Sequence, residues 1–149
     1  MTETGLDIRR ILEILPHRHP FVMVDRILSL LPGDRAVGLK NVTINEPYFA
    51  GHFPGHPVMP GAMLIEAVAQ TGAILAYFSE PERPAGAPLF IAGLDRVRFR
   101  RPVYPGDRLI METTILNRRT AAIRMRGTAS VDGVLCAEGE LLALWGEYQ

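Results

Sequence analysis

The sequence predicts an α+β fold in which a curved antiparallel sheet wraps a long central helix. Two observations support it: residues 58–77 form a nearly continuous apolar run, and the C-terminal part alternates as strands do. The predicted helix has no clean polar face, so packing on one side of a flat sheet would leave apolar surface exposed. A strongly curved sheet would bury it, and a second subunit would cover the remainder. The length of 149 residues predicts one domain, residues 1–149.

The N-terminal part predicts a short helix and two strands. Asp7 caps a helix over residues 8–15, which Pro16 ends. Residues 21–31 and 36–44 are rich in valine, isoleucine and leucine and predict strands.

A rigid loop, the long helix and four strands follow. Residues 45–60 contain six prolines and glycines, which forbid regular structure and predict a stiff, shaped loop. The long helix begins at Gly61 and runs to about residue 78, and residues 79–88 form a proline-rich loop. The predicted C-terminal strands cover residues 89–102, 109–116, 121–131 and 134–145.

Composition and charge exclude several classes of protein. Lys+Arg and Asp+Glu both number 16, so the formal net charge is zero, unlike that of a general nucleic-acid binder. Glu66 and Gln70 inside the apolar run argue against a membrane span. The single cysteine, Cys136, forbids an intrachain disulfide and fits a reducing compartment. Residues 1–5 lack a basic region followed by an apolar run, so we expect no signal peptide and a cytoplasmic protein.

The most informative pattern is a histidine in the rigid loop followed by a carboxylate in the apolar helix. Glu66 lies among apolar neighbours, and burial favours the neutral, proton-donating form of a carboxyl group. His52 is held between Gly51 and Phe53, and a neutral imidazole accepts protons near physiological pH. Structural roles are the alternatives for both residues. Together they predict a general acid, Glu66, and a general base, His52.

Gly61 is the third part of the pattern. The first N–H groups of a helix lack intrahelical partners and can hold a carbonyl oxygen that becomes enolate-like. Glu66 follows five residues later, roughly 7.5 Å along the axis at ~1.5 Å per residue. The three residues predict proton abstraction beside a carbonyl, followed by loss of a β-hydroxyl. We expect no metal, because His52 and His56 lie in a proline-broken loop without a third ligand, and no cofactor, because no nucleotide-binding motif occurs.

These residues belong to a set of motifs that resembles the (3R)-hydroxyacyl-acyl-carrier-protein dehydratases of type II fatty acid synthesis, the FabZ type. The resemblance covers nearly the whole chain, through residues 15–21, 24–26, 40–43, 45–47, 51–61, 66–70, 100–103 and 105–107. It implies a hot-dog fold, a substrate carried by acyl carrier protein, and a homodimer. Each site of that dimer would combine His52 of one subunit with Glu66 of the other, and the dimers would form a hexamer.

The resemblance also implies an apolar tunnel for the acyl chain at the dimer interface. The residues at the matching positions, beside Gly61 at the helix start, are Leu15, Pro16, Phe53, Val58, Tyr77 and Pro102. The chain departs from the family pattern at two positions. His19 stands where a tyrosine is usual, and Phe90 stands where some members have a tyrosine that gates the tunnel.

An arginine-rich segment, residues 96–101, has two interpretations. On a strand, Arg96, Arg98 and Arg100 would share one face, with Val97 and Phe99 on the other. That face is either a solvated surface or a docking surface for the acidic acyl carrier protein.

Three other functions remain open at this point. A hot-dog thioesterase would hydrolyse the thioester, and a non-catalytic subunit would bind it without turnover. An isomerising dehydratase of the FabA type resembles the same motif but has aspartate at the acid position, so Glu66 argues against it.

Overall fold

The computed structural model describes residues 5–84 and 86–148. Residues 1–4, part of the segment behind the expectation of no signal peptide, and Ala85 of the predicted loop lie outside this range. The described elements, in chain order, are α1 (Ile8–Ile14), β1 (Arg26–Leu31), β2 (Arg35–Asn41), the 3-10 turn η1 (Pro47–Ala50), α2 (Gly61–Ser79), β3 (Leu89–Phe99), β4 (Arg108–Arg118), β5 (Ala122–Val131) and β6 (Val134–Trp145).

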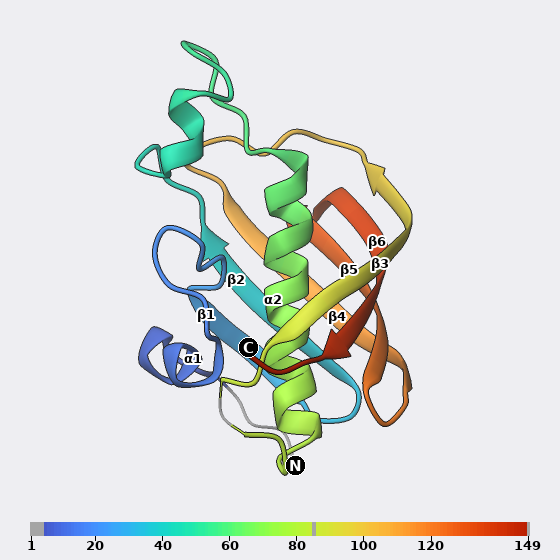
Figure 1. The fold of residues 1–149 in the computed structure, drawn as a ribbon. Helices are drawn as coiled ribbons and strands as arrows, with labels where there is room; N and C mark the ends of the chain where they lie inside the picture. The colour runs from blue at the N-terminus through green and yellow to red at the C-terminus, as the bar shows by residue number, and fades with distance from the viewer. Residues whose placement is uncertain (1–4, 85, 149) are drawn as a thin grey trace.

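The six strands form one antiparallel sheet in the order β1-β2-β4-β5-β6-β3. The sheet curves around α2, which lies along its concave face (Figure 1). The core forms where α2 meets the sheet, with Leu75 of the helix and Leu109 and Met111 of β4 fully buried. The predicted α+β hot-dog fold is therefore confirmed.

Helix α2 is long and apolar enough to cross a membrane by length and composition. In this fold it is the core helix, because residues such as Ile74 and Ala76 are completely buried against the sheet. Its start at Gly61 agrees with the sequence prediction, and its end at Ser79 lies one residue beyond it.

The first predicted strand begins later than the sequence indicated. Strand β1 starts at Arg26, and residues 21–25 form no part of the ladder. Instead, the Met23 N–H donates to the side-chain oxygen of Gln70, and the Phe21 carbonyl accepts from the Gln70 amide nitrogen. The Gln70 side chain of α2 therefore supplies the hydrogen bonds that a neighbouring strand would otherwise have made with this segment.

Two more predictions are corrected in detail. The loop over residues 45–60 contains the short 3-10 turn η1, which begins at Pro47, because proline's fixed φ suits the first position of such a turn. Strand β3 ends at Phe99 rather than residue 102, since the N–H groups of Arg100 and Arg101 both donate to the Cys136 carbonyl.

Strand β3 lies at one edge of the sheet and pairs with β6. Its register shifts between Asp95 and Arg98, where Arg96 has a positive φ of 54°. Ile91 and Leu94 stand exposed on this strand, with 42% and 48% of their surface accessible. An exposed apolar edge strand offers both backbone groups and side chains to a further strand.

Candidate active site

His52 is fixed by hydrogen bonds within its loop. Its backbone N–H donates to the Tyr48 carbonyl of η1 (3.0 Å), and its carbonyl accepts from the Val58 N–H (3.0 Å). Its ring Nδ1 lies 2.6 Å from the Val58 carbonyl oxygen. Because a carbonyl oxygen only accepts hydrogen bonds, Nδ1 carries the proton in the neutral ring and Nε2 keeps its lone pair.

An open pocket of about 510 Å³ lies beside His52. Its lining residues come from the His52 loop, the start of α2 and the end of β3: His52, Val58, Met59, Gly61, Leu64, Phe99, Arg100, Arg101 and Pro102. Four of the predicted catalytic and tunnel residues, His52, Val58, Gly61 and Pro102, therefore meet around one cavity, together with Arg100 of the predicted docking surface. Phe53 stacks on the His52 ring at 4.1 Å between centroids.

The start of α2 presents free backbone donors at this pocket. The N–H groups of Met63 and Leu64 both donate to the Pro60 carbonyl, whereas those of Gly61 and Ala62 lie before the first N–H that has an acceptor in the helix, and they have no backbone partner among the described residues. A Cβ on Gly61 would lie 2.8 Å from the Phe99 ring. The glycine thus lets an aromatic ring pack directly against the helix start.

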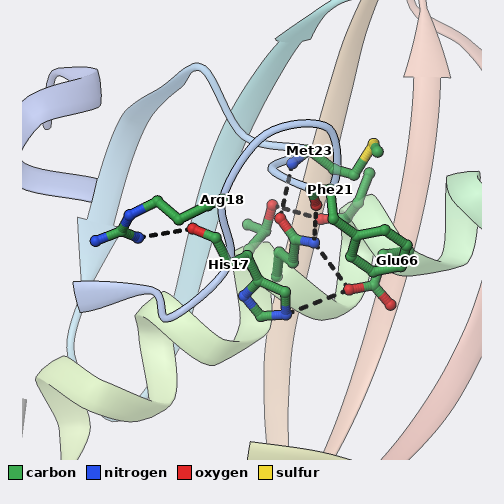
Figure 2. A network of polar contacts seen from close by, with 8 residues as sticks. His17, Arg18, Phe21, Met23 and Glu66 are labelled. Atoms are coloured by element: carbon green, nitrogen blue, oxygen red, sulfur yellow. Dashed lines mark hydrogen bonds and ion pairs between the residues drawn. The ribbon is translucent and has the colours of Figure 1, made fainter. Parts of the chain in front are cut away.

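Glu66 lies on α2 within a polar network (Figure 2). Its Oε1 accepts a hydrogen bond from Gln70 Nε2 (2.8 Å) and lies 3.5 Å from His17 Nε2. Gln70 is buried, and its own oxygen accepts from the Met23 N–H (2.7 Å), which fixes the orientation of the amide. Figure 2 shows the second carboxylate oxygen of Glu66 pointing away from these partners.

His17, in the segment that follows α1, is half-buried beside Glu66. Burial lowers the pKa of His17 below its ordinary value, and the neighbouring Glu66 carboxylate partly opposes that shift. The neutral form is therefore favoured near pH 7. Its Nδ1 is buried and has no hydrogen-bond partner among the described residues.

Glu66 opens into a second pocket, of about 270 Å³. The residues that line it are His17, Phe21, Glu66, Ala69, Gln70, Ala73, Leu89, Phe90 and Ile91. This set shares no member with the lining of the His52 pocket. A single chain therefore does not bring the two predicted catalytic side chains into one cavity.

The remaining predicted tunnel residues are distributed differently. Phe90 lines the Glu66 pocket and is 54% exposed. Leu15 is buried in the core, and Tyr77 is partly buried and packs against that core. Pro16 is exposed at the end of α1.

Two of the three arginines of the predicted docking surface, Arg96 and Arg100, form ion pairs with carboxylates on β6. Arg96 lies 3.1 Å from Glu140, and Arg100 lies 3.2 Å from Glu138. The Arg100 guanidinium lowers the pKa of Glu138 below its usual value. Arg98 pairs in register with Glu138 across the strands.

Sequence reasoning missed His17 and Gln70. The i, i+4 spacing of Glu66 and Gln70 on one helix was the available signal for the amide. Nothing local connected Glu66 with a histidine 49 positions earlier in the chain. Within residues 5–84 and 86–148, no three histidine, cysteine or acidic side chains gather as metal ligands would.

The fold and these polar groups define a helix-in-sheet protein with acid–base side chains at two cavities. The chain belongs to the FabA-like domain family, which matches residues 15–140. Among curated proteins it is similar to 3-hydroxyacyl-acyl-carrier-protein dehydratases FabZ. The relative from Myxococcus xanthus is 52% identical over 93% of this chain and 90% of its own length. The relative from Pelotomaculum thermopropionicum is 56% identical over 92% and 96%.

Solved structures agree on the fold. The dehydratase heterocomplex ApeI:P from Xenorhabdus doucetiae contains a chain that superposes with a TM-score of 0.79. That chain is 18% identical, and the match covers 92% of the present chain and 91% of its own length. The TT0310 protein from Thermus thermophilus superposes with a TM-score of 0.63 at 20% identity, over 87% of this chain and 100% of its own.

Proposed function

We propose that the chain dehydrates (3R)-hydroxyacyl-acyl-carrier-protein to the trans-2-enoyl thioester in fatty acid synthesis. Family membership and relatives of about half-identical sequence support the dehydratase class. One observation of geometry carries the assignment of roles: the hydrogen bond between His52 Nδ1 and the Val58 carbonyl. It leaves Nε2 as an unprotonated base beside the N-terminus of a helix.

The bond changes follow from these positions. His52 Nε2 takes the proton from C2 of the thioester, and the carbonyl oxygen gains enolate character. The N–H groups of Gly61 and Ala62 stabilise that oxygen. The electron pair then forms the C2–C3 double bond as the C3–O bond breaks, and the acid proton of Glu66 leaves with the hydroxyl as water.

The network around Glu66 supports a defined proton position. Gln70 Nε2 can only donate to Oε1, so Oε1 acts as the acceptor, and in the proposed acid form of Glu66 the proton lies on Oε2. Oε2 is also the oxygen that points away from Gln70 and His17.

We further propose that the active protein is a homodimer with shared sites, His52 from one subunit and Glu66 from the other. Two observations support it. The two side chains of one chain open into separate pockets, and the β3 edge exposes Ile91 and Leu94. A two-fold contact pairs each pocket of one copy with the other pocket of the second copy. A hexamer of three such dimers in the cytoplasm, without cofactor, completes this proposal.

The proposed reaction is tested in reverse, by monitoring the hydration of a 2-enoyl thioester through the loss of its absorbance. His52→Ala and Glu66→Gln should each abolish turnover while leaving the circular dichroism spectrum unchanged. His56→Ala is the matched control, since it removes an exposed histidine from the same loop. Product analysis separates the alternatives: free thiol would indicate a thioesterase, and a shifted double bond an isomerase. Near-normal turnover in either site variant refutes the assigned roles.

Mixing the two inactive variants tests the shared site. A mixed dimer of His52→Ala and Glu66→Gln subunits contains one site with both native residues. After subunit exchange, random pairing of identical two-fold partners should restore about a quarter of wild-type activity. Sites contained within single chains would give no recovery.

The arginine surface of β3 is proposed to dock the acidic carrier protein. Arg100 also lines the His52 pocket, so docking there would bring the carried thioester to the base. Glutamate substitutions at Arg98 and Arg100 should raise KM for carrier-bound substrate and spare small thioester analogues. Equal effects on both substrates contradict the docking role.

A further inference from the structure

Lys40 and Glu46 form an ion pair inside the protein, near the His52 loop. Lys40, on β2, is only 3% exposed, and its Nζ lies 2.9 Å from Glu46 Oε1. The Glu46 side chain is itself 15% exposed. Removing two charges from water is costly, so such a pair calls for a reason other than stability.

The position of Glu46 supplies that reason. Glu46 is the residue that precedes η1, and its carbonyl accepts from the Phe49 N–H (3.2 Å). Within η1, the Tyr48 carbonyl accepts a hydrogen bond from the His52 N–H. Lys40 therefore binds the residue just before η1, and a carbonyl within η1, that of Tyr48, binds the backbone of the base.

The loop has few other polar connections to the rest of the chain. Its ends are tied through backbone hydrogen bonds, from Val42 N–H to Asp107 O and from Met59 N–H to Val103 O. Between them, over residues 43–58, the Lys40–Glu46 contact is the only side-chain hydrogen bond to a residue outside the loop, among the described residues. Phe49 is buried and adds apolar packing, which is not directional.

We propose that Lys40 and Glu46 are positioning residues that set the place of the His52 imidazole through η1. The proposal rests on the base role of His52 and deepens it. It predicts that the pair affects the chemical step more than the binding of the thioester, since neither residue lines the pocket beside His52.

The test uses a double variant, Lys40→Met with Glu46→Gln, because a single substitution would strand one buried charge and could unfold the protein. The double variant should fold, and kcat for enoyl hydration should fall roughly 10- to 100-fold with KM unchanged. The charge-swapped variant, Lys40→Glu with Glu46→Lys, restores an ion pair and should recover part of kcat. The control is Arg35→Met with Glu112→Gln, which removes an exposed ion pair at the other end of β2 and should leave kcat at the wild-type value.

Amide hydrogen exchange provides a readout that is independent of activity. The N–H groups of His52 and Val58 should exchange faster in the double variant, whereas those of β4 keep wild-type rates. A kcat within about twofold of the control, or a rise in KM alone, overturns the positioning role. If wild-type protein hydrates no thioester, the proposed function fails. The exchange rates then decide separately whether the ion pair orders the loop, and unchanged rates overturn that claim.

Discussion

Replacing Gln70 by leucine would disconnect Glu66 from the segment that precedes β1. The amide makes three hydrogen bonds at once: it donates to Glu66 Oε1 and the Phe21 carbonyl, and it accepts from the Met23 N–H. Leucine fills a similar volume and makes none of them. The substitution therefore removes the polar partners while keeping the packing of α2 nearly intact.

The expected cost follows from what remains buried. Met23 is completely buried, so its N–H loses its acceptor without access to water, at about 1–3 kcal/mol. Phe21 is 46% exposed, and its carbonyl can turn to solvent at little cost. The free energy of unfolding should fall by about 2 kcal/mol. Because Glu66 also loses the donor that orients Oε1, kcat should fall by roughly 100-fold.

Urea denaturation at a fixed protein concentration measures the first quantity, and enoyl-thioester hydration under saturating substrate measures the second. Thr71→Val is the matched control. It removes a buried hydroxyl on the adjacent residue, which donates to the Ala67 carbonyl within α2 and has no contact with Glu66. Wild-type kcat in Gln70→Leu, or an equal loss of kcat in Thr71→Val, would refute the orienting role of the amide.

Three further predictions concern titration, packing and assembly. Because the pKa of His17 is lowered in the folded protein, the unfolded chain binds the proton more readily once the pH falls below the ordinary value of 6.5, and protonation then favours unfolding. Wild-type stability should therefore fall as the pH drops below that value, and His17→Gln should flatten the slope; parallel slopes contradict this. A Cβ on Gly127 would overlap a Val68 methyl, so Gly127→Ala should cost about 1–3 kcal/mol in thermal unfolding, and an unchanged Tm would refute the close approach. Leu94→Asp on the β3 edge should yield a folded, inactive monomer by sedimentation; an active dimer would contradict the proposed interface.

Elements with strong local signals were predicted well. Strand β6 has the predicted bounds, because an Asp132-Gly133 turn precedes it and Trp145 closes its alternating run. Helix α2 was equally clear from its apolar length. The start of β1 was predicted wrongly. The Met23 N–H donates to the side chain of Gln70, 47 residues away, and no local pattern in residues 21–25 indicates that contact.

The same limit applies to the site. His52 and Glu66 stand out because a rigid loop and an apolar helix are unusual surroundings for titratable groups. Their supporting partners do not, because His17 and Glu66 are distant in the sequence and meet only in the folded structure. The irregularity in β3 where Arg96 has a positive φ could not be predicted either, because the alternating sequence pattern assumes a regular strand.

The separation of acid and base links chemistry to assembly. Helix α2 contributes to both pockets: its first residue, Gly61, lines the His52 pocket, and Glu66, half-buried one turn further along, lines the other. Within a single chain the two side chains open into different cavities, because the two pockets have no lining residue in common. In the proposed homodimer, a two-fold partner supplies the missing half of each site and at the same time covers the apolar residues of β3. In that proposed dimer, burial of the β3 surface stabilises the same contact that completes the site, whereas an isolated subunit keeps the proposed base and acid in separate pockets.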